Sequence, residues 1–153
     1  MERFAVALGE LALEKKAEKV VVMDLRKLET VTDFFVICSG HVEPHVRAIA
    51  DHILRTMARN GVKSLHQEGY HGSRWILLDY LDVVVHIFQP AWRDYYRLED
   101  LWGDARIRVL DEAYLEKKTQ REKRKAAQKP KKTRTTSQKG KVPGVKGKRG
   151  RKS

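Results

Sequence analysis

Residues 73–102 read SRWILLDYLDVVVHIFQPAWRDYYRLEDLW, and the rest of the predicted fold is arranged around them. They contain two apolar runs, Arg74 to Asp79 and Asp82 to Phe88, that are rich in aliphatic, β-branched and aromatic residues. Two such runs joined by two residues are typical of a β-hairpin. Leu81 fits the joint poorly, because tight hairpin turns place Gly or Asn at positive φ. We therefore predict a strand pair closed by a turn of unusual sequence.

The segments before this hairpin alternate between helical and strand patterns. Apolar residues at helical spacing predict helices over about 2–17 and from Glu43 to the Asn60-Gly61 stop signal. Apolar runs predict buried strands at 20–25 and 33–38, and a weaker edge strand at 62–68. This alternation indicates an α/β protein.

Helical patterns follow the hairpin. Pro90 begins a predicted helix that ends near Leu98, and a short helical turn reaches Trp102. The apolar pattern then weakens, and we expect one or two more amphipathic turns between Ile107 and Leu115. Together these elements predict a single α/β domain over residues 1–115, with a mixed five-stranded sheet flanked by helices.

The charge of the chain is unevenly distributed. The net charge is +12, yet residues 116–153 carry 17 Lys+Arg against 2 Asp+Glu, whereas residues 1–115 carry 15 against 18. We predict a basic C-terminal tail over 116–153 that is weakly helical up to 128 and disordered beyond. Such a tail can contact phosphates by counterion release, or it can serve only as a solvated tail that aids solubility. It has no aromatic residue, so stacking on bases is not supported.

Several classes of protein are disfavoured by composition. The single Cys38 excludes an intramolecular disulfide framework and a multi-cysteine metal site. No apolar run approaches the ~20 residues of a membrane span. The first residues lack the features of a signal or transit peptide, so we expect a cytoplasmic protein.

Catalytic motifs are weak. Ser39-Gly40 lies between a predicted strand and a predicted helix, where a nucleotidyltransferase holds phosphates, with Mg²⁺ on strand carboxylates. Asp79 and Asp82 are three residues apart across a turn, so they project differently and favour hairpin-edge roles. His41 and His45 have helical spacing but lack a third ligand nearby. We predict no enzyme, no cofactor and no metal, and we expect His86 to have a satisfied hydrogen bond within a strand.

Aromatic residues gather in the second half of the body. Trp75, Leu77 and Asp79 share one strand face, and Tyr80 lies on the other face with Ile76 and Leu78. A face that ends in a carboxylate is partly open to water, and Trp and Tyr on such faces anchor protein interfaces. Trp75 fits a core and an interface equally, whereas Tyr80 and Tyr96 favour an interface.

Four motifs together resemble the ribosomal silencing factor family, RsfS/Iojap: TDFFVICSG (32–40), AIAD (48–51), WILLDYLDVVVHIF (75–88) and YYRLEDLW (95–102). The resemblance covers about residues 4–104. It implies a nucleotidyltransferase-like α/β fold without demonstrated transferase chemistry. It also implies binding to the large ribosomal subunit through its protein L fourteen, which blocks joining of the small subunit and lowers translation when nutrients are scarce. Homodimers of the free protein are implied as well.

The resemblance also implies which residues bind the partner. By position these are Trp75, Asp79, Asp82, Tyr95, Tyr96, Leu98, Leu101 and Trp102. Tyr80 is added because tyrosine side chains favour interfaces. The family usually has Gly where this chain has Leu81, and often Thr-Ser where it has His41-Val42. The basic tail lies outside the resemblance and is a candidate for contact with ribosomal RNA. Two alternatives remain, namely a nucleotidyltransferase-type enzyme and a general RNA-binding protein that acts through the tail.

Overall fold

A six-stranded mixed sheet forms the centre of the molecule in the computed structural model, which describes residues 1–129. The strand order is β3-β4-β5-β2-β1-β6. The elements in chain order are α1 (Glu2–Glu14), β1 (Glu18–Asp24), a short 3-10 helix (Arg26–Leu28), β2 (Phe34–Ser39), α2 (Glu43–Arg59), β3 (His66–Glu68), β4 (Trp75–Asp79), β5 (Val83–Phe88), α3 (Pro90–Tyr96), α4 (Leu98–Leu101), β6 (Arg106–Leu110) and α5 (Glu112–Gln128).

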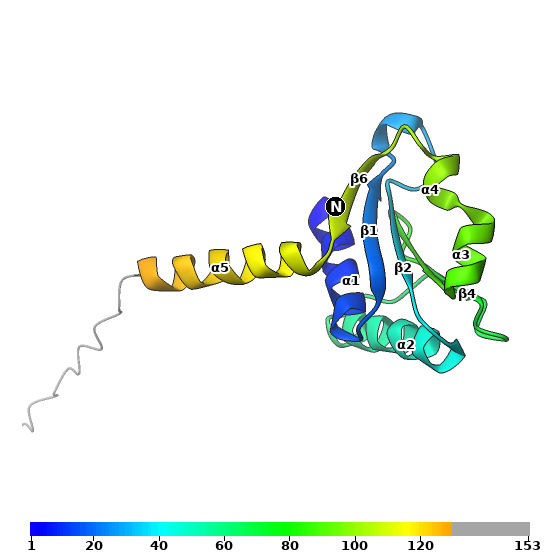
Figure 1. Cartoon of the computed structure of the whole chain (residues 1–153), viewed down its shortest axis with the longest axis horizontal. Coiled ribbons are helices and arrows are strands. Elements are labelled where there is room, and N and C mark those ends of the chain that lie inside the picture. Colours follow the sequence, from blue (N-terminus) through cyan, green and yellow to red (C-terminus); the bar gives the residue numbers. More distant parts are fainter. Residues whose placement is uncertain (130–153) are drawn as a thin grey trace, which may run out of the picture.

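The layers of the molecule follow from this sheet. Strands β2 and β5 are parallel and the other neighbouring pairs are antiparallel, so the sheet is mixed as predicted. Helices α1 and α2 cover one face, and α3 and α4 lie over part of the other face (Figure 1). The larger hydrophobic cluster fills the space between the sheet and α1 and α2. None of the described helices is both long enough and apolar enough to span a membrane.

The predicted count of five strands was wrong, because β6 is a sixth strand where we expected helical turns. It pairs antiparallel with β1 along the edge of the sheet. Its sequence alternates Arg106, Ile107, Arg108 and Val109, which is the period of two that a strand requires. The arginines share one face of the sheet, and Ile107 and Val109 share the other and are exposed. The mixture of charge and half-exposed apolar residues hid this edge strand from a search for buried runs.

Helix α5 projects away from the rest of the molecule (Figure 1). Its N-cap is Asp111, whose carboxylate accepts a hydrogen bond from the backbone N–H of Tyr114 at 2.9 Å. The helix confirms the predicted helical character of 116–128 and crosses the predicted domain boundary after residue 115. The predicted disorder beyond residue 129 lies outside the described residues.

The hairpin between β4 and β5 is confirmed, and its turn has the strain that the sequence indicated. Leu81 has a φ of 73° and an exposed side chain. The N–H of Asp82 donates to the carbonyl of Tyr80 at 3.0 Å, which closes a three-residue turn around Leu81. The carboxylate of Asp79 accepts from the N–H of Leu81 at 2.8 Å. The turn therefore holds a branched side chain in a backbone region that favours glycine.

Replacing this leucine by glycine is expected to stabilise the fold. Leu81→Gly removes the cost of a positive φ in the folded state, which is about 1–3 kcal/mol. Glycine also gives the unfolded chain more conformational freedom, which opposes folding by about 0.5–1 kcal/mol. The free energy of unfolding should therefore rise by about 1 kcal/mol. Urea unfolding of Leu81→Gly and Leu81→Ala provides the measurement. Alanine keeps its Cβ, so it should give no such gain. An equal gain for both variants would show that the benefit comes from loss of the exposed leucine.

Candidate partner-binding surface

The sheet face opposite α1 and α2 carries a second, smaller hydrophobic cluster. Cross-strand pairing places Trp75 beside Phe88 and Leu77 beside His86 on this face. The indole of Trp75 stacks on Phe88 with ring centres 4.9 Å apart. The ring centre of Tyr96, on α3, lies 4.7 Å from that of Trp75. The sequence left Trp75 open between core and interface, and it is half-buried in the structure.

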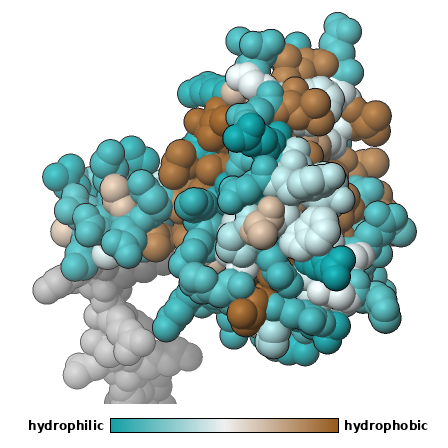
Figure 2. Space-filling view, turned by 45° about the vertical axis from the view of Figure 1, so that its right-hand side comes forward, coloured by the Kyte–Doolittle hydropathy of each residue, from teal (hydrophilic) through white to brown (hydrophobic). Residues whose placement is uncertain are grey.

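Helices α3 and α4 extend this cluster into an exposed apolar area. We define the aromatic surface as Trp75, Trp92, Tyr95, Tyr96, Leu98, Leu101 and Trp102. Tyr95 is 75% exposed and Leu101 69%, and both are too exposed to serve a core. Figure 2 shows apolar side chains interrupted by polar ones on the side of the molecule where α3 and α4 lie. Half-buried aromatic anchors surrounded by exposed apolar side chains are typical of protein-binding sites.

A buried histidine positions the tryptophan of this surface. The indole N–H of Trp75 donates to Nδ1 of His86 at 3.0 Å. His86 is 4% exposed, and its burial lowers the pKa of the imidazole to about 3. Because Nδ1 accepts, the neutral ring carries its proton on Nε2, which has no hydrogen-bond partner within residues 1–129. The predicted hydrogen bond of His86 is thus present on one nitrogen only.

This histidine makes stability depend on pH. Its pKa is about 3 in the folded chain and about 6.5 when unfolded, so the unfolded state binds a proton that the folded state does not. The contribution of neutral, buried His86 to the free energy of unfolding is complete above about pH 6.5. It falls by about 1.4 kcal/mol per pH unit below about pH 6.5, down to about pH 3. When the pH is lowered from about 7 to about 4.5, the free energy of unfolding of the parent chain should therefore fall by about 2–3 kcal/mol more than that of His86→Gln.

Urea unfolding at several pH values measures this difference. The control is His71→Gln, because His71 is exposed in a loop and its side chain remains in water in both states. The control should keep the pH dependence of the parent chain. Parallel curves for the parent and His86→Gln would contradict the assignment.

A buried arginine fixes the two helices of the aromatic surface to the sheet. Nε and Nη2 of Arg93 donate to one carboxylate oxygen of Glu99 at 2.8 and 2.6 Å. Nη1 donates to the carbonyl of Lys19 at 2.8 Å and to the hydroxyl of Ser39 at 2.9 Å. One guanidinium thus joins α3 to α4 and to the ends of β1 and β2. Sequence reasoning missed Arg93, because its partners lie 6, 54 and 74 residues away.

The remaining predicted site residues lie at or near the hairpin. Asp79 and Asp82 are half-buried at its tip, and Asp79 serves the turn as the hairpin-edge interpretation predicted. Tyr80 was predicted to favour an interface, and the structure contradicts this. Its side chain is 7% exposed and packs edge-on against Phe4 on the α1 face, because strand alternation groups it with the buried Ile76 and Leu78. Tyr80 therefore belongs to the core.

The catalytic alternative loses its geometric support. Asp82 directly precedes β5 and lies beside the start of the parallel strand β2, where its carbonyl accepts from the N–H of Phe34, and Ser39 lies at the other end of β2. Five residues of strand separate the two ends by about 16 Å, too far for one metal-phosphate site. The hydroxyl of Ser39 is occupied by Arg93. In the part of the chain that the structure describes, no group of three metal-ligating side chains comes together.

Comparisons with known proteins place this chain in one family. The family model described as "Ribosomal silencing factor during starvation" matches residues 1–140. Proteins named ribosomal silencing factor RsfS are similar to this chain. One from Halalkalibacterium halodurans is 45% identical over 92 residues, which are 60% of this chain and 79% of the relative. One from Bacillus subtilis is 42% identical over 98 residues, which are 64% of this chain and 83% of the relative.

Solved structures show the same fold. A crystal structure of a Chromobacterium violaceum protein has a TM-score of 0.63 and 31% identity, and covers 66% of this chain and 85% of that protein. A Bacillus halodurans structure has a TM-score of 0.60 and 36% identity, with 71% and 98% covered.

Proposed function

Because the chain belongs to the ribosomal silencing factor family and its role is therefore ribosome-associated silencing, we propose that it binds the large ribosomal subunit and blocks joining of the small subunit. The observation that supports this mechanism is the aromatic surface beside the hairpin. A steric blocker needs no catalytic group, but it needs an area of about 800 Å² on which a second body would otherwise sit. Trp75, Tyr96 and Leu101 provide the apolar centre of such an area.

The partner on the large subunit is proposed to be ribosomal protein L fourteen, as the resemblance implies. Residues 1–115 have more acidic than basic side chains, which suits docking on a basic ribosomal protein. Asp79, on the same strand face as Trp75, and Asp82, at the tip of the hairpin, are proposed to face basic groups of that partner. The free protein is proposed to be a cytoplasmic homodimer and not an enzyme. The tail over 116–153 is proposed to add contacts to ribosomal RNA.

Co-sedimentation with separated ribosomal subunits tests the binding step. The full chain should migrate with large subunits in a sucrose gradient and remain at the top with small subunits. Equal migration with both subunits would favour a general RNA-binding protein instead. Calorimetric titration of the chain with ATP and Mg²⁺ tests the enzyme alternative. Heat of binding at micromolar protein concentration would support an enzyme of the nucleotidyltransferase type.

A further inference from the structure

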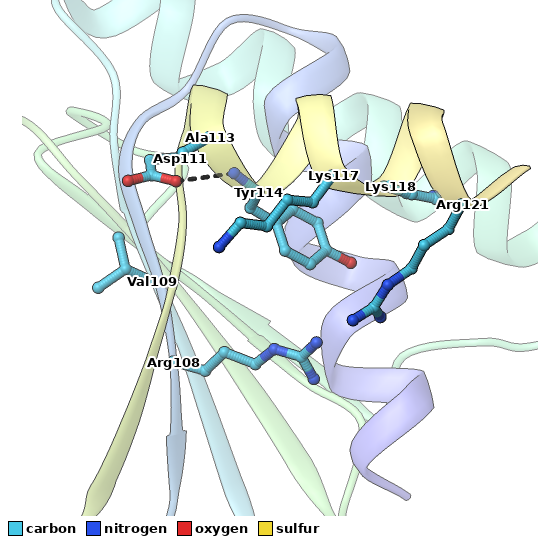
Figure 3. Close-up of a pocket in the computed structure, with 8 residues that line it drawn as sticks. All are labelled: Arg108, Val109, Asp111, Ala113, Tyr114, Lys117, Lys118 and Arg121. Atoms are coloured by element: carbon cyan, nitrogen blue, oxygen red, sulfur yellow. Dashed lines mark hydrogen bonds between the residues drawn. The ribbon is translucent and has the colours of Figure 1, made fainter. Parts of the chain in front are cut away.

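The junction of β6 and α5 contains a cationic cavity that the aromatic surface does not use. The cavity has a volume of about 380 Å³ and is lined by Arg108 of β6 and by Tyr114, Lys117 and Arg121 of α5. Figure 3 shows both guanidinium groups on the same side of the Tyr114 ring. The Arg108 guanidinium carbon lies 5.5 Å from the centre of that ring. Two permanent cations therefore converge on one hollow.

Acidic side chains near the cavity leave part of this charge uncompensated. Glu10 accepts from Lys118 at 2.6 Å and from the Tyr114 hydroxyl at 2.7 Å, so its two oxygens are committed. Asp111 caps α5. Arg108 reaches a carboxylate of Glu2 only at 3.8 Å. Among the ion pairs within residues 1–129, none involves Lys117 or Arg121. Clustered like charges at a partly enclosed site favour binding of an anion.

The cationic character continues along the helix. Lys117, Arg121 and Lys125 follow at intervals of four residues, so they form a stripe on one face with a spacing of about 6 Å. The helix projects from the body, which leaves this stripe open to a large partner (Figure 1). A single small anion would fill the cavity and leave the stripe unused. A polymer of phosphates would use both, and guanidinium forks match phosphate oxygens in a bidentate manner.

We infer that the β6–α5 junction, with Arg108 and Arg121 as its anchors, binds the phosphate backbone of an RNA strand. This inference rests on the proposed function, because that function places the chain on an RNA-rich particle. Strand β6 lies at the sheet edge opposite β3, and α5 lies across the sheet from α3 (Figure 1). The junction is therefore separate from the aromatic surface. Binding of RNA at the β6–α5 junction would hold the chain on the particle and so raise the effective concentration of the aromatic surface near its own partner.

A matched pair of double variants tests the site. Arg108→Gln with Arg121→Gln removes both anchors, whereas Arg59→Gln with Lys63→Gln removes two exposed charges at and just after the end of α2, outside the basic tail. The probe is a fluorescently labelled RNA hairpin, and anisotropy of the full chain is measured over a series of salt concentrations. The first pair should weaken binding about 10-fold near 0.1 M salt and reduce the salt slope by roughly 1.5, while the control pair should weaken it less than about threefold.

Further variants keep the test decisive. Arg121→Gln alone, on the projecting helix, should weaken binding about threefold without altering the fold, and Arg121→Lys should restore part of the loss. Equal losses for the two double variants would overturn the site in favour of diffuse charge. Displacement of the RNA by an equal charge of poly-glutamate would overturn its assignment to RNA.

This assay contains no ribosome, so it fails or succeeds independently of the proposed function. If the parent chain does not co-sediment with large subunits while the anchor variants still lose RNA, the proposed function falls and the site stands. If large subunits bind the parent and the anchor variants equally and RNA binding is unchanged, the site falls and the proposed function stands.

Discussion

Leu101→Asp is expected to weaken binding to the large ribosomal subunit by about 30-fold or more. The leucine is exposed in the free chain and lies on the aromatic surface, and in the proposed complex the partner would bury it. A carboxylate buried there without a partner costs at least about 2 kcal/mol, which equals that factor in the dissociation constant. Co-sedimentation over a range of subunit concentrations gives the measurement.

Matched controls separate this effect from general damage. Val62→Asp places the same charge on an exposed apolar residue just after α2, on the opposite side of the sheet, and should bind as the parent does. Trp75→Phe keeps the ring packing and loses the hydrogen bond to His86, so it should bind more tightly than Trp75→Ala. Equal binding by Leu101→Asp and the parent chain would remove α4 from the interface.

Arg93→Met should be the most destabilising single change on this side of the molecule. It removes four hydrogen bonds of a buried guanidinium and leaves Glu99 and the hydroxyl of Ser39 without their donor. Breaking a buried ion pair in this way costs about 3 kcal/mol of the free energy of unfolding. Because Arg93 joins α3 and α4 to the sheet, binding to the large subunit should weaken as well.

The neighbouring Arg97 offers the control. Its ion pair with Asp100 is exposed, with an N–O distance of 3.6 Å, so Arg97→Met should change the free energy of unfolding by no more than about 0.5 kcal/mol. Urea unfolding measures both variants. A similar small change for Arg93→Met would mean that the packing of Trp92 and Leu98, and not the arginine, holds the two helices.

The hairpin shows which parts of the fold are predictable from sequence. The alternation of Trp75, Leu77 and Asp79 with Ile76 and Leu78 assigned the two strand faces correctly, because strand periodicity is a local property. The same rule, applied to Tyr80, predicts burial, and the preference of tyrosine for interfaces was given too much weight against it. Strand β6 also had the right period, but its short, half-exposed sequence did not resemble a buried run.

The contacts that position the aromatic surface were beyond local patterns. Arg93 reads as one more charged residue in a helix, and only the folded chain brings it to Ser39 and Lys19. The burial of His86 on both sides likewise depends on Phe35 and Trp75, from two different strands. The cationic cavity forms where an unpredicted strand meets a helix that was predicted only weakly. Long-range contacts therefore account for most of what the sequence did not indicate.

An assay of subunit joining, with light scattering as the readout, tests the central claim most directly. Purified small and large subunits are mixed after the large subunits have been incubated with the parent chain, with Leu101→Asp or with Val62→Asp. The account predicts that the parent and Val62→Asp suppress the rise in scattering in proportion to bound protein, and that Leu101→Asp does not. Full joining in the presence of large subunits saturated with the parent chain would contradict it.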